Sequence, residues 1–199
     1  MKSISFLTVC AKASIASLLL AGSASANFVN LNDFYQDPTV TVSVDGYSAV
    51  IHEDSSLSSV LLSNNPSLGD PNVILPAAGL ALVFNYSFAQ PASNNQDEFG
   101  VFLVDANTGG SAGAAYESFI QMAGSGVKSF NLSGLVGSTI GLQFQLSALP
   151  GDAAFTSTVT ISNVRLEPVP EPEEWAMLLV GSMLVGYQVR RKQKALNLT

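Results

Sequence analysis

Few side chains in this chain of 199 residues could carry out chemistry. The only histidine is His52, and the only cysteine is Cys10. A nucleophilic triad needs a base that is itself held by a third group, but His52 and its neighbour Glu53 lie in an alternating segment, where successive side chains point to opposite faces. Clusters of histidine and cysteine that would bind zinc are absent from the sequence. We therefore expect His52 to be a lone solvated histidine, and we expect the protein to have no catalytic residue and not to be an enzyme.

The carboxylates are the remaining candidates for a site. Asp97 and Glu98 are adjacent, and no pattern pairs them with a carboxylate facing the same cleft, as glycoside hydrolysis would require. Calcium, however, takes carboxylates and carbonyls from polar loops. The loop carboxylates that fit this chemistry are Asp70, Asp97, Glu98 and Asp152. None matches the calcium loop Asp-x-Asp-x-Asp-Gly, so solvated loop charges and a structural calcium ion both stay open, and no other cofactor is expected.

Alternation of period two predicts the elements that hold these residues. Its longest sets are 80–88, 99–103 and 140–146, and shorter ones cover 39–44 and 47–52, while 57–62 is a short apolar run. Asp45-Gly46 between two alternating segments predicts a hairpin. The segment 113–122 is ambiguous between a helical turn and a strand, and we interpret it as a strand. Together these patterns predict an all-β fold, an antiparallel β-sandwich of jelly-roll type spanning residues 27–168.

The last alternating segment, 156–166, contains a change of parity. Val159 and Ile161 share one face, whereas Val164 and Leu166 fall on the other in a regular strand. One extra residue at Ser162-Asn163 would return both pairs to the core. The sequence therefore predicts a β-bulge there.

The charge of residues 27–168 is strongly acidic. Lys128 and Arg165 stand against twelve carboxylates. Nucleic acid and anionic lipid surfaces are therefore excluded as partners of this region, because it offers no basic patch for phosphate groups.

The N-terminal residues 1–26 have the composition of a secretory signal peptide. Lys2 and Lys12 are basic, residues 13–21 are apolar, and Ala24-Ser25-Ala26 provides small residues for cleavage. We expect signal peptidase to cut after Ala26, with Ala24 and Ala26 forming the site. Cys10 leaves with this segment, so the exported domain holds together without disulfides.

The C-terminal residues combine an apolar run with asymmetric charges. The run at 175–189 spans about 22 Å as a helix, which is short of the roughly 30 Å hydrocarbon core of a bilayer. Because the run lacks a polar face, we expect a single, marginal transmembrane helix rather than an amphipathic or buried one. Glutamates precede the run, and basic residues follow it, including Arg190, Arg191 and Lys192. We expect these basic residues to place the C-terminus in the cytoplasm.

Val169-Pro170-Glu171-Pro172, then Glu174-Trp175-Ala176-Met177-Leu178-Leu179 and Arg190-Arg191, resemble the PEP-CTERM sorting signal of Gram-negative bacteria. The resemblance covers residues 169–199. It implies that Pro170, Glu171 and Pro172 are the motif recognised by the membrane-embedded enzyme exosortase. It also implies a transient inner-membrane anchor, followed by transfer to the cell surface or extracellular matrix.

Two functions follow as expectations. The first is a non-enzymatic surface or matrix protein within an exopolysaccharide-rich biofilm coat. The alternative is an exopolysaccharide-binding protein similar to carbohydrate-binding modules, suggested by the sandwich and by aromatic residues such as Tyr47, Tyr86 and Tyr116. The absence of tryptophan from residues 27–168 speaks against the alternative, because sugar platforms favour large exposed rings.

Overall fold

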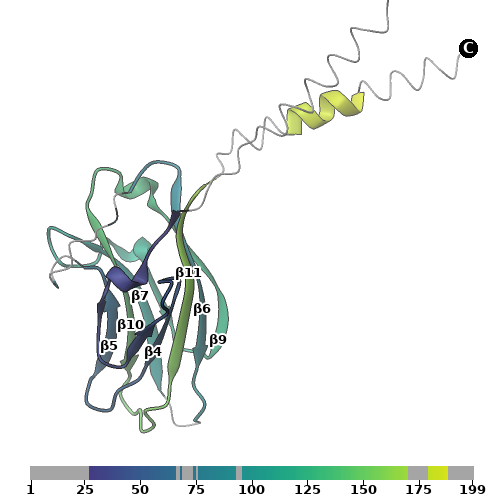
Figure 1. Cartoon of the computed structure of the whole chain (residues 1–199). Helices are drawn as coiled ribbons and strands as arrows, with labels where there is room; N and C mark the ends of the chain where they lie inside the picture. The colour runs from purple at the N-terminus through teal and green to yellow at the C-terminus, as the bar shows by residue number, and fades with distance from the viewer. Residues whose placement is uncertain are drawn as a thin grey trace, which may run out of the picture.

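The described part of the protein is a two-layer antiparallel β-sandwich (Figure 1). The computed structural model describes residues 27–65, 68, 74, 76–92, 96–169 and 179–187. The first sheet has the order β3-β4-β11-β6-β9, with β1 also paired to β11, and the second has the order β2-β5-β10-β7-β8. The predicted antiparallel sandwich is confirmed.

The strands of the first sheet are β1 (Asn27–Phe28), β3 (Val40–Val42), β4 (Ser48–His52), β6 (Leu80–Ala89), β9 (Gly124–Asn131) and β11 (Thr158–Pro168). Those of the second sheet are β2 (Tyr35–Gln36), β5 (Ser59–Ser63), β7 (Asp97–Asp105), β8 (Glu117–Ile120) and β10 (Ile140–Ala148). Short 3₁₀ turns lie at η1 (Leu31–Asp33), η3 (Ala114–Tyr116) and η4 (Leu132–Leu135). From β8 onward the chain passes from one sheet to the other at every strand, so both sheets contribute to one core.

The core is formed by the inward rows of the long strands, as the alternation predicts. In β10 every second side chain from Ile140 to Leu146 is buried. In β6 the buried side chains include Leu82, Phe84 and Phe88. The rings of Phe84 and Phe144, which belong to opposite sheets, pack edge-to-face with their centroids 5.2 Å apart. This geometry is favourable for aromatic pairs, and it joins the two layers near their centre.

The strand β11 carries the predicted bulge. Its register with β6 shifts between Ser162 and Arg165, and Asn163 has a φ of 54°. Asparagine tolerates this left-handed conformation better than most residues. Val164 is buried as a result, so the prediction is confirmed.

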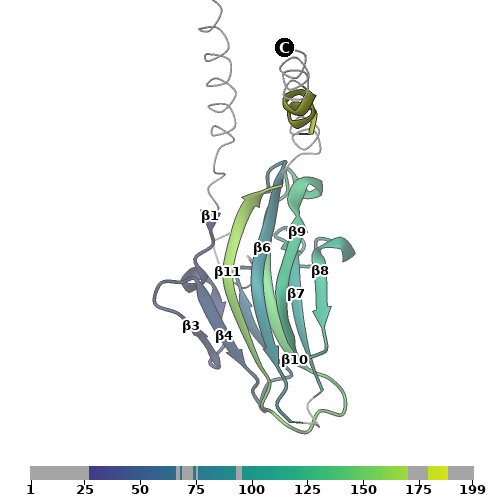
Figure 2. The ribbon, with the colours of Figure 1, turned by 90° about the vertical axis from the view of Figure 1, so that its right-hand side faces the viewer.

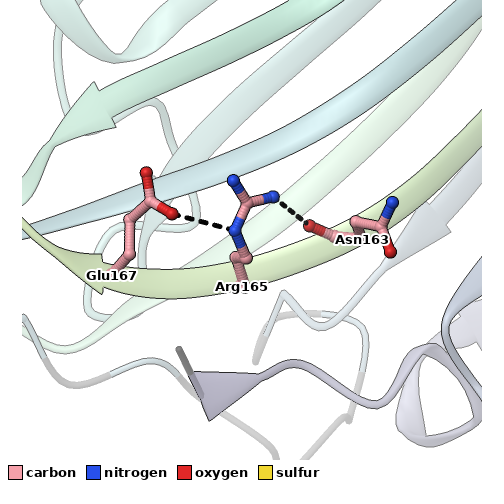
Figure 3. Close-up of polar contacts among 3 residues, drawn as sticks. All are labelled: Asn163, Arg165 and Glu167. Atoms are coloured by element: carbon pink, nitrogen blue, oxygen red, sulfur yellow. Dashed lines mark hydrogen bonds and ion pairs between the residues drawn. The ribbon is translucent and has the colours of Figure 1, made fainter. Parts of the chain in front are cut away.

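A small polar cluster follows the bulge on the surface of β11 (Figure 3). Nε of Arg165 lies 2.9 Å from Oε2 of Glu167, and Nη1 donates to the carbonyl of Asn163 at 3.1 Å. The guanidinium therefore contacts the carbonyl of the residue that adopts the unusual conformation. Figure 2 shows β11 beside β6, with β9 on the other side of β6 in the same sheet.

Other local predictions have mixed outcomes. Residues 43–48 form the hairpin between β3 and β4, and Gly46 has the positive φ of 73° that the turn requires. The ambiguous segment 113–122 divides into the 3₁₀ turn η3 and the short strand β8. The strand β9 was not expected, because its sequence GSGVKSFN is rich in glycine and serine.

The features predicted at both chain ends lie mainly outside the described residues. These are the signal peptide with Ala24 and Ala26, the motif Pro170, Glu171 and Pro172, and the basic residues Arg190, Arg191 and Lys192. A helix is described at 179–187 (Figure 1). Its apolar side chains are exposed. No helix in the described ranges is long and apolar enough to cross a membrane.

Candidate functional site

Three carboxylates meet at one end of the sandwich. Glu53 directly follows β4, Asp97 begins β7, and Asp152 lies in the connection from β10 to β11. His52, the neighbour of Glu53, pairs with Thr158 at the start of β11, and Asp97 pairs with Ala148 at the end of β10. Asp152 lies between these two strands in the sequence, so the three carboxylates belong to the same end of the sandwich. The opposite end holds β1, where Asn27 pairs with Leu166. One oxygen from each of the three carboxylates lies within 4.8 Å of the other two.

Each carboxylate uses one oxygen to fix its position. Ser157 donates its backbone N–H to Oε2 of Glu53 at 3.2 Å and its hydroxyl to Oδ2 of Asp97 at 2.5 Å. The backbone N–H of Gln96 donates to Oδ1 of Asp152 at 2.8 Å. The second oxygen of each group, Oε1 of Glu53, Oδ1 of Asp97 and Oδ2 of Asp152, is buried and has no hydrogen-bond partner.

The cluster is electrostatically unfavourable without a counter-charge. Desolvation raises the pKa of Glu53 from 4.5 to about 7, and the Ser157 N–H opposes the rise. The hydrogen bond that protonated Glu53 can give to Asp97, and the charges of Asp97 and Asp152, add to the rise. Asp97 is the most deeply placed of the three, with 1% of its surface exposed. Buried carboxylates normally have a partner, because an unpaired buried charge costs several kcal/mol. This group can therefore hold either shared protons or a hard cation.

The structure revises the sequence-based set of loop carboxylates. Asp97 and Asp152 come together, as a calcium site would require, but Glu98 points away and accepts from Nε2 of Gln121 at 2.7 Å. Asp70 lies outside the described residues. From the sequence, Glu53 is a candidate only as a relay partner of His52 and not as a metal ligand, yet it completes the cluster. His52 itself is exposed at the end of β4.

A second candidate surface lies on the outer face of the second sheet. The ring of Phe102 on β7 covers Gly100, where an added Cβ would lie 2.7 Å from Cε2 of that ring. Phe119 on β8, opposite Gly100, meets Phe102 edge to face with centroids 5.3 Å apart. Covering a strand glycine with an aromatic ring stabilises a sheet, but Phe119 still leaves 52% of its surface exposed. The pair therefore offers an apolar platform to solvent.

A row of amides runs beside this platform along β10. Gln143 donates Nε2 to Oε1 of Gln145 at 3.1 Å, and Gln145 donates Nε2 to Oγ of Ser147 at 2.7 Å. Gln143 pairs with Phe102 across the strands, and Gln145 pairs with Gly100. A side-chain amide offers two donors and one oxygen acceptor, so each glutamine keeps hydrogen-bonding capacity beyond this row. We call the surface formed by Phe102, Phe119, Gln143, Gln145 and Ser147 the amide–aromatic face.

Other exposed surfaces have different chemistry. The outer face of the first sheet presents small polar residues, including Thr160 and Ser87, with Val127 as an exposed apolar residue at 64%. Among the tyrosines predicted as platforms, Tyr86 and Tyr116 pack against the core. Tyr47 is half exposed and lies 5.1 Å from the ring of Phe28. This pair is a smaller aromatic surface, near the end of the sandwich where β1 lies.

Comparisons with known proteins give no family assignment. No family model matches the chain, and no curated protein matches it. Among solved structures, it is similar to TmCBM61 in complex with beta-1,4-galactotriose, with a TM-score of 0.43 and 12% identity over 68% of this chain and 86% of that one. It is also similar to SGBP-B from a xyloglucan utilization locus in Bacteroides uniformis, with a TM-score of 0.40 and 15% identity over 72% of this chain and 49% of that one. An exo-beta-agarase matches with a TM-score of 0.40 and 12% identity over 76% of this chain and 24% of its own. Values this low carry no argument about function.

Proposed function

We propose that the chain is an exported, non-enzymatic protein of the cell surface or extracellular matrix whose sandwich, of jelly-roll type, binds a neutral polysaccharide. The observation that carries this proposal is the amide–aromatic face. Sugar rings stack their apolar faces on aromatic side chains, and amide groups exchange hydrogen bonds with their hydroxyls. The excess of carboxylates over Lys128 and Arg165 disfavours an acidic polymer, because like charges repel.

The carboxylate cluster does not favour a hydrolase. Glycosidases place two carboxylates about 5–10 Å apart on either side of a bond that enters an open cleft. Here the unpartnered oxygens of Glu53, Asp97 and Asp152 are buried. A glycosidic bond cannot come between them without opening the end of the sandwich, so the raised pKa of Glu53 does not make it a general acid for a sugar substrate.

A binding screen with matched variants tests the polysaccharide proposal. The full chain, purified in detergent, is applied to an array of neutral and acidic polysaccharides. We expect binding to neutral polymers, and we expect Phe119→Ala and Gln145→Ala each to weaken it by about tenfold, equivalent to about 1.4 kcal/mol. Val127→Ala on the outer face of the other sheet is the control. Uniformly blank arrays refute the function, and loss on Tyr47→Ala alone moves the site to the Phe28–Tyr47 pair.

The proposed route to the surface is sorting by exosortase after removal of residues 1–26 by signal peptidase. Its support is the sequence Val169-Pro170-Glu171-Pro172, followed by an apolar run and a basic cluster. Two prolines favour an extended backbone suited to a protease groove. Replacing Pro170, Glu171 and Pro172 by alanine should leave the chain uncleaved in the inner membrane, as followed by fractionation and blotting. Normal release of the variant to the surface contradicts the sorting route.

A further inference from the structure

We propose that Glu53, Asp97 and Asp152 bind one calcium ion, which joins the end of β4, the start of β7 and the connection from β10 to β11 at the end of the sandwich opposite β1. This site is independent of polysaccharide binding. It rests on the arrangement of the three carboxylates and on the buried oxygens that they leave without a partner.

The hydrogen bonds around the cluster have a common arrangement. In each carboxylate one oxygen accepts from a fixed protein donor, and the other is the oxygen without a partner. Protein donors therefore orient the three groups but do not neutralise them. Asp97 gives the sharpest indication, because its side chain is almost fully buried, its Oδ1 has no partner, and one of its oxygens lies within 4.8 Å of an oxygen of each of the other two carboxylates.

A single shared proton does not satisfy the cluster. A proton on Oε1 of Glu53 could be donated to Oδ1 of Asp97, which would satisfy both of those atoms. Oδ2 of Asp152 would still be buried without a donor. Among the described residues, the two side chains with a fixed positive charge lie elsewhere: Lys128 is on β9, and Arg165 pairs with Glu167. A divalent cation would contact one oxygen of each carboxylate at once.

The donor set indicates a hard cation, and its spacing is compatible with calcium. All three ligands are carboxylate oxygens, which suit hard cations rather than zinc or copper. Two oxygens on opposite sides of a calcium ion are about 4.6–5.2 Å apart, twice the usual bond length, compared with about 4.0–4.2 Å for magnesium. Separations within 4.8 Å are compatible with three oxygens on one calcium sphere. Loop carbonyls and water would complete its six to eight ligands.

The consequence is a cross-link between both sheets. Glu53 belongs to the first sheet through β4, Asp97 belongs to the second through β7, and Asp152 belongs to the connection between β10 and β11. A chain without disulfides gains from such a link, since an ion that binds only the folded state stabilises it.

Calorimetric titration of the full chain, purified in detergent and stripped with a chelator, tests the proposal. We expect one calcium ion per chain and a rise in Tm on binding. Asp152→Asn should weaken the affinity by at least about tenfold, because one charged ligand is lost. Asp54→Asn is the matched control, since it removes the same charge one residue from Glu53 while keeping an oxygen for the Ser56 N–H. This control should bind like the original chain.

Three results overturn the proposal. One is the absence of calcium binding, and another is tighter binding of magnesium than of calcium. The third is equal binding by the original chain and Asp152→Asn, which would indicate diffuse attraction to an acidic surface. If circular dichroism shows that Asp152→Asn is unfolded, Glu53→Gln replaces it with the same expected loss. Because the readout is calcium binding, failure here leaves the polysaccharide arrays unaffected.

Discussion

Neutralising Glu53 should stabilise the metal-free protein at neutral and alkaline pH. The substitution Glu53→Gln keeps an oxygen for the Ser157 N–H, and its new NH₂ group can donate to the unpartnered Oδ1 of Asp97. It also removes one charge from three that repel one another. In the presence of a chelator, the variant should therefore have a larger free energy of unfolding than the original chain.

The size of this effect follows from the pKa of Glu53, which rises from 4.5 to about 7 on folding because the carboxyl loses water. At about 1.4 kcal/mol for each pH unit the upper value is about 3 kcal/mol, and because Glu53 is only half buried we expect about 1–2 kcal/mol. For a domain of this size that corresponds to a rise in Tm of about 3–6 °C.

The pH dependence has a defined sign. A carboxyl whose pKa is raised on folding binds more protons in the folded state, so its ionisation destabilises the fold as pH rises. Below pH 4.5, the pKa of Glu53 in the unfolded chain, ionisation of Glu53 should cause little difference in the free energy of unfolding between the original chain and Glu53→Gln. This difference should grow as the pH rises and level off above about pH 7. Excess calcium should reverse the sign, because glutamine offers the ion a neutral oxygen in place of a charged one.

Thermal melts of the two proteins between about pH 4 and pH 8, with chelator and then with calcium, measure this difference. Asp54→Asn again provides the charge control. An unchanged difference in Tm across the pH range would refute the reasoning that Glu53 ionises within a desolvated cluster. A constant gain would instead point to packing or hydrogen bonding of the new amide.

Three further predictions concern the fold and are checked by urea unfolding. Gly141→Ala should cost about 1–3 kcal/mol, because its Cβ would lie 2.8 Å from the backbone Cα of Asn65, whereas Gly124→Ala meets nothing within 4 Å and should cost less. Asn163→Val should cost about 1–2 kcal/mol at its φ of 54°, and Asn163→Gly should be tolerated; equal costs would contradict a conformational cause. Glu167→Gln should change stability by less than about 1 kcal/mol, because its ion pair with Arg165 is partly exposed, and a larger loss would show that the pair stabilises the bulge.

The long strands were predictable because their sequence patterns agree with their surroundings. Ile140 to Leu146 alternates apolar and polar residues, and β10 has one face in the core and one in water. The bulge in β11 was predictable for the same reason, since only an extra residue brings Val164 to the side of Ile161. By contrast, β9 has a single well-buried side chain, Phe130, and forms through pairing with β6. Its own residues carry almost no strand signal.

The candidate cation site was only partly predictable, although its key signal was present. On β4 the inward row runs Ala49, Ile51 and then Glu53, one residue beyond the strand. On β7 the same parity places Asp97 in the row of Phe99 and Val101. A carboxylate that continues an apolar row faces the interior, and it must find a partner there. Comparing Glu53 with its strand rather than with His52 would have identified it.

Parity also explains why the adjacent Asp97 and Glu98 have different environments. Asp97 faces into the end of the sandwich, whereas Glu98 faces outward and contacts Gln121. No such rule applies to Asp152, which lies in a connection and reaches the cluster only because β10 ends and β11 begins at that end. Strand parity can therefore nominate two of the three ligands from sequence, and the third requires the topology of both sheets.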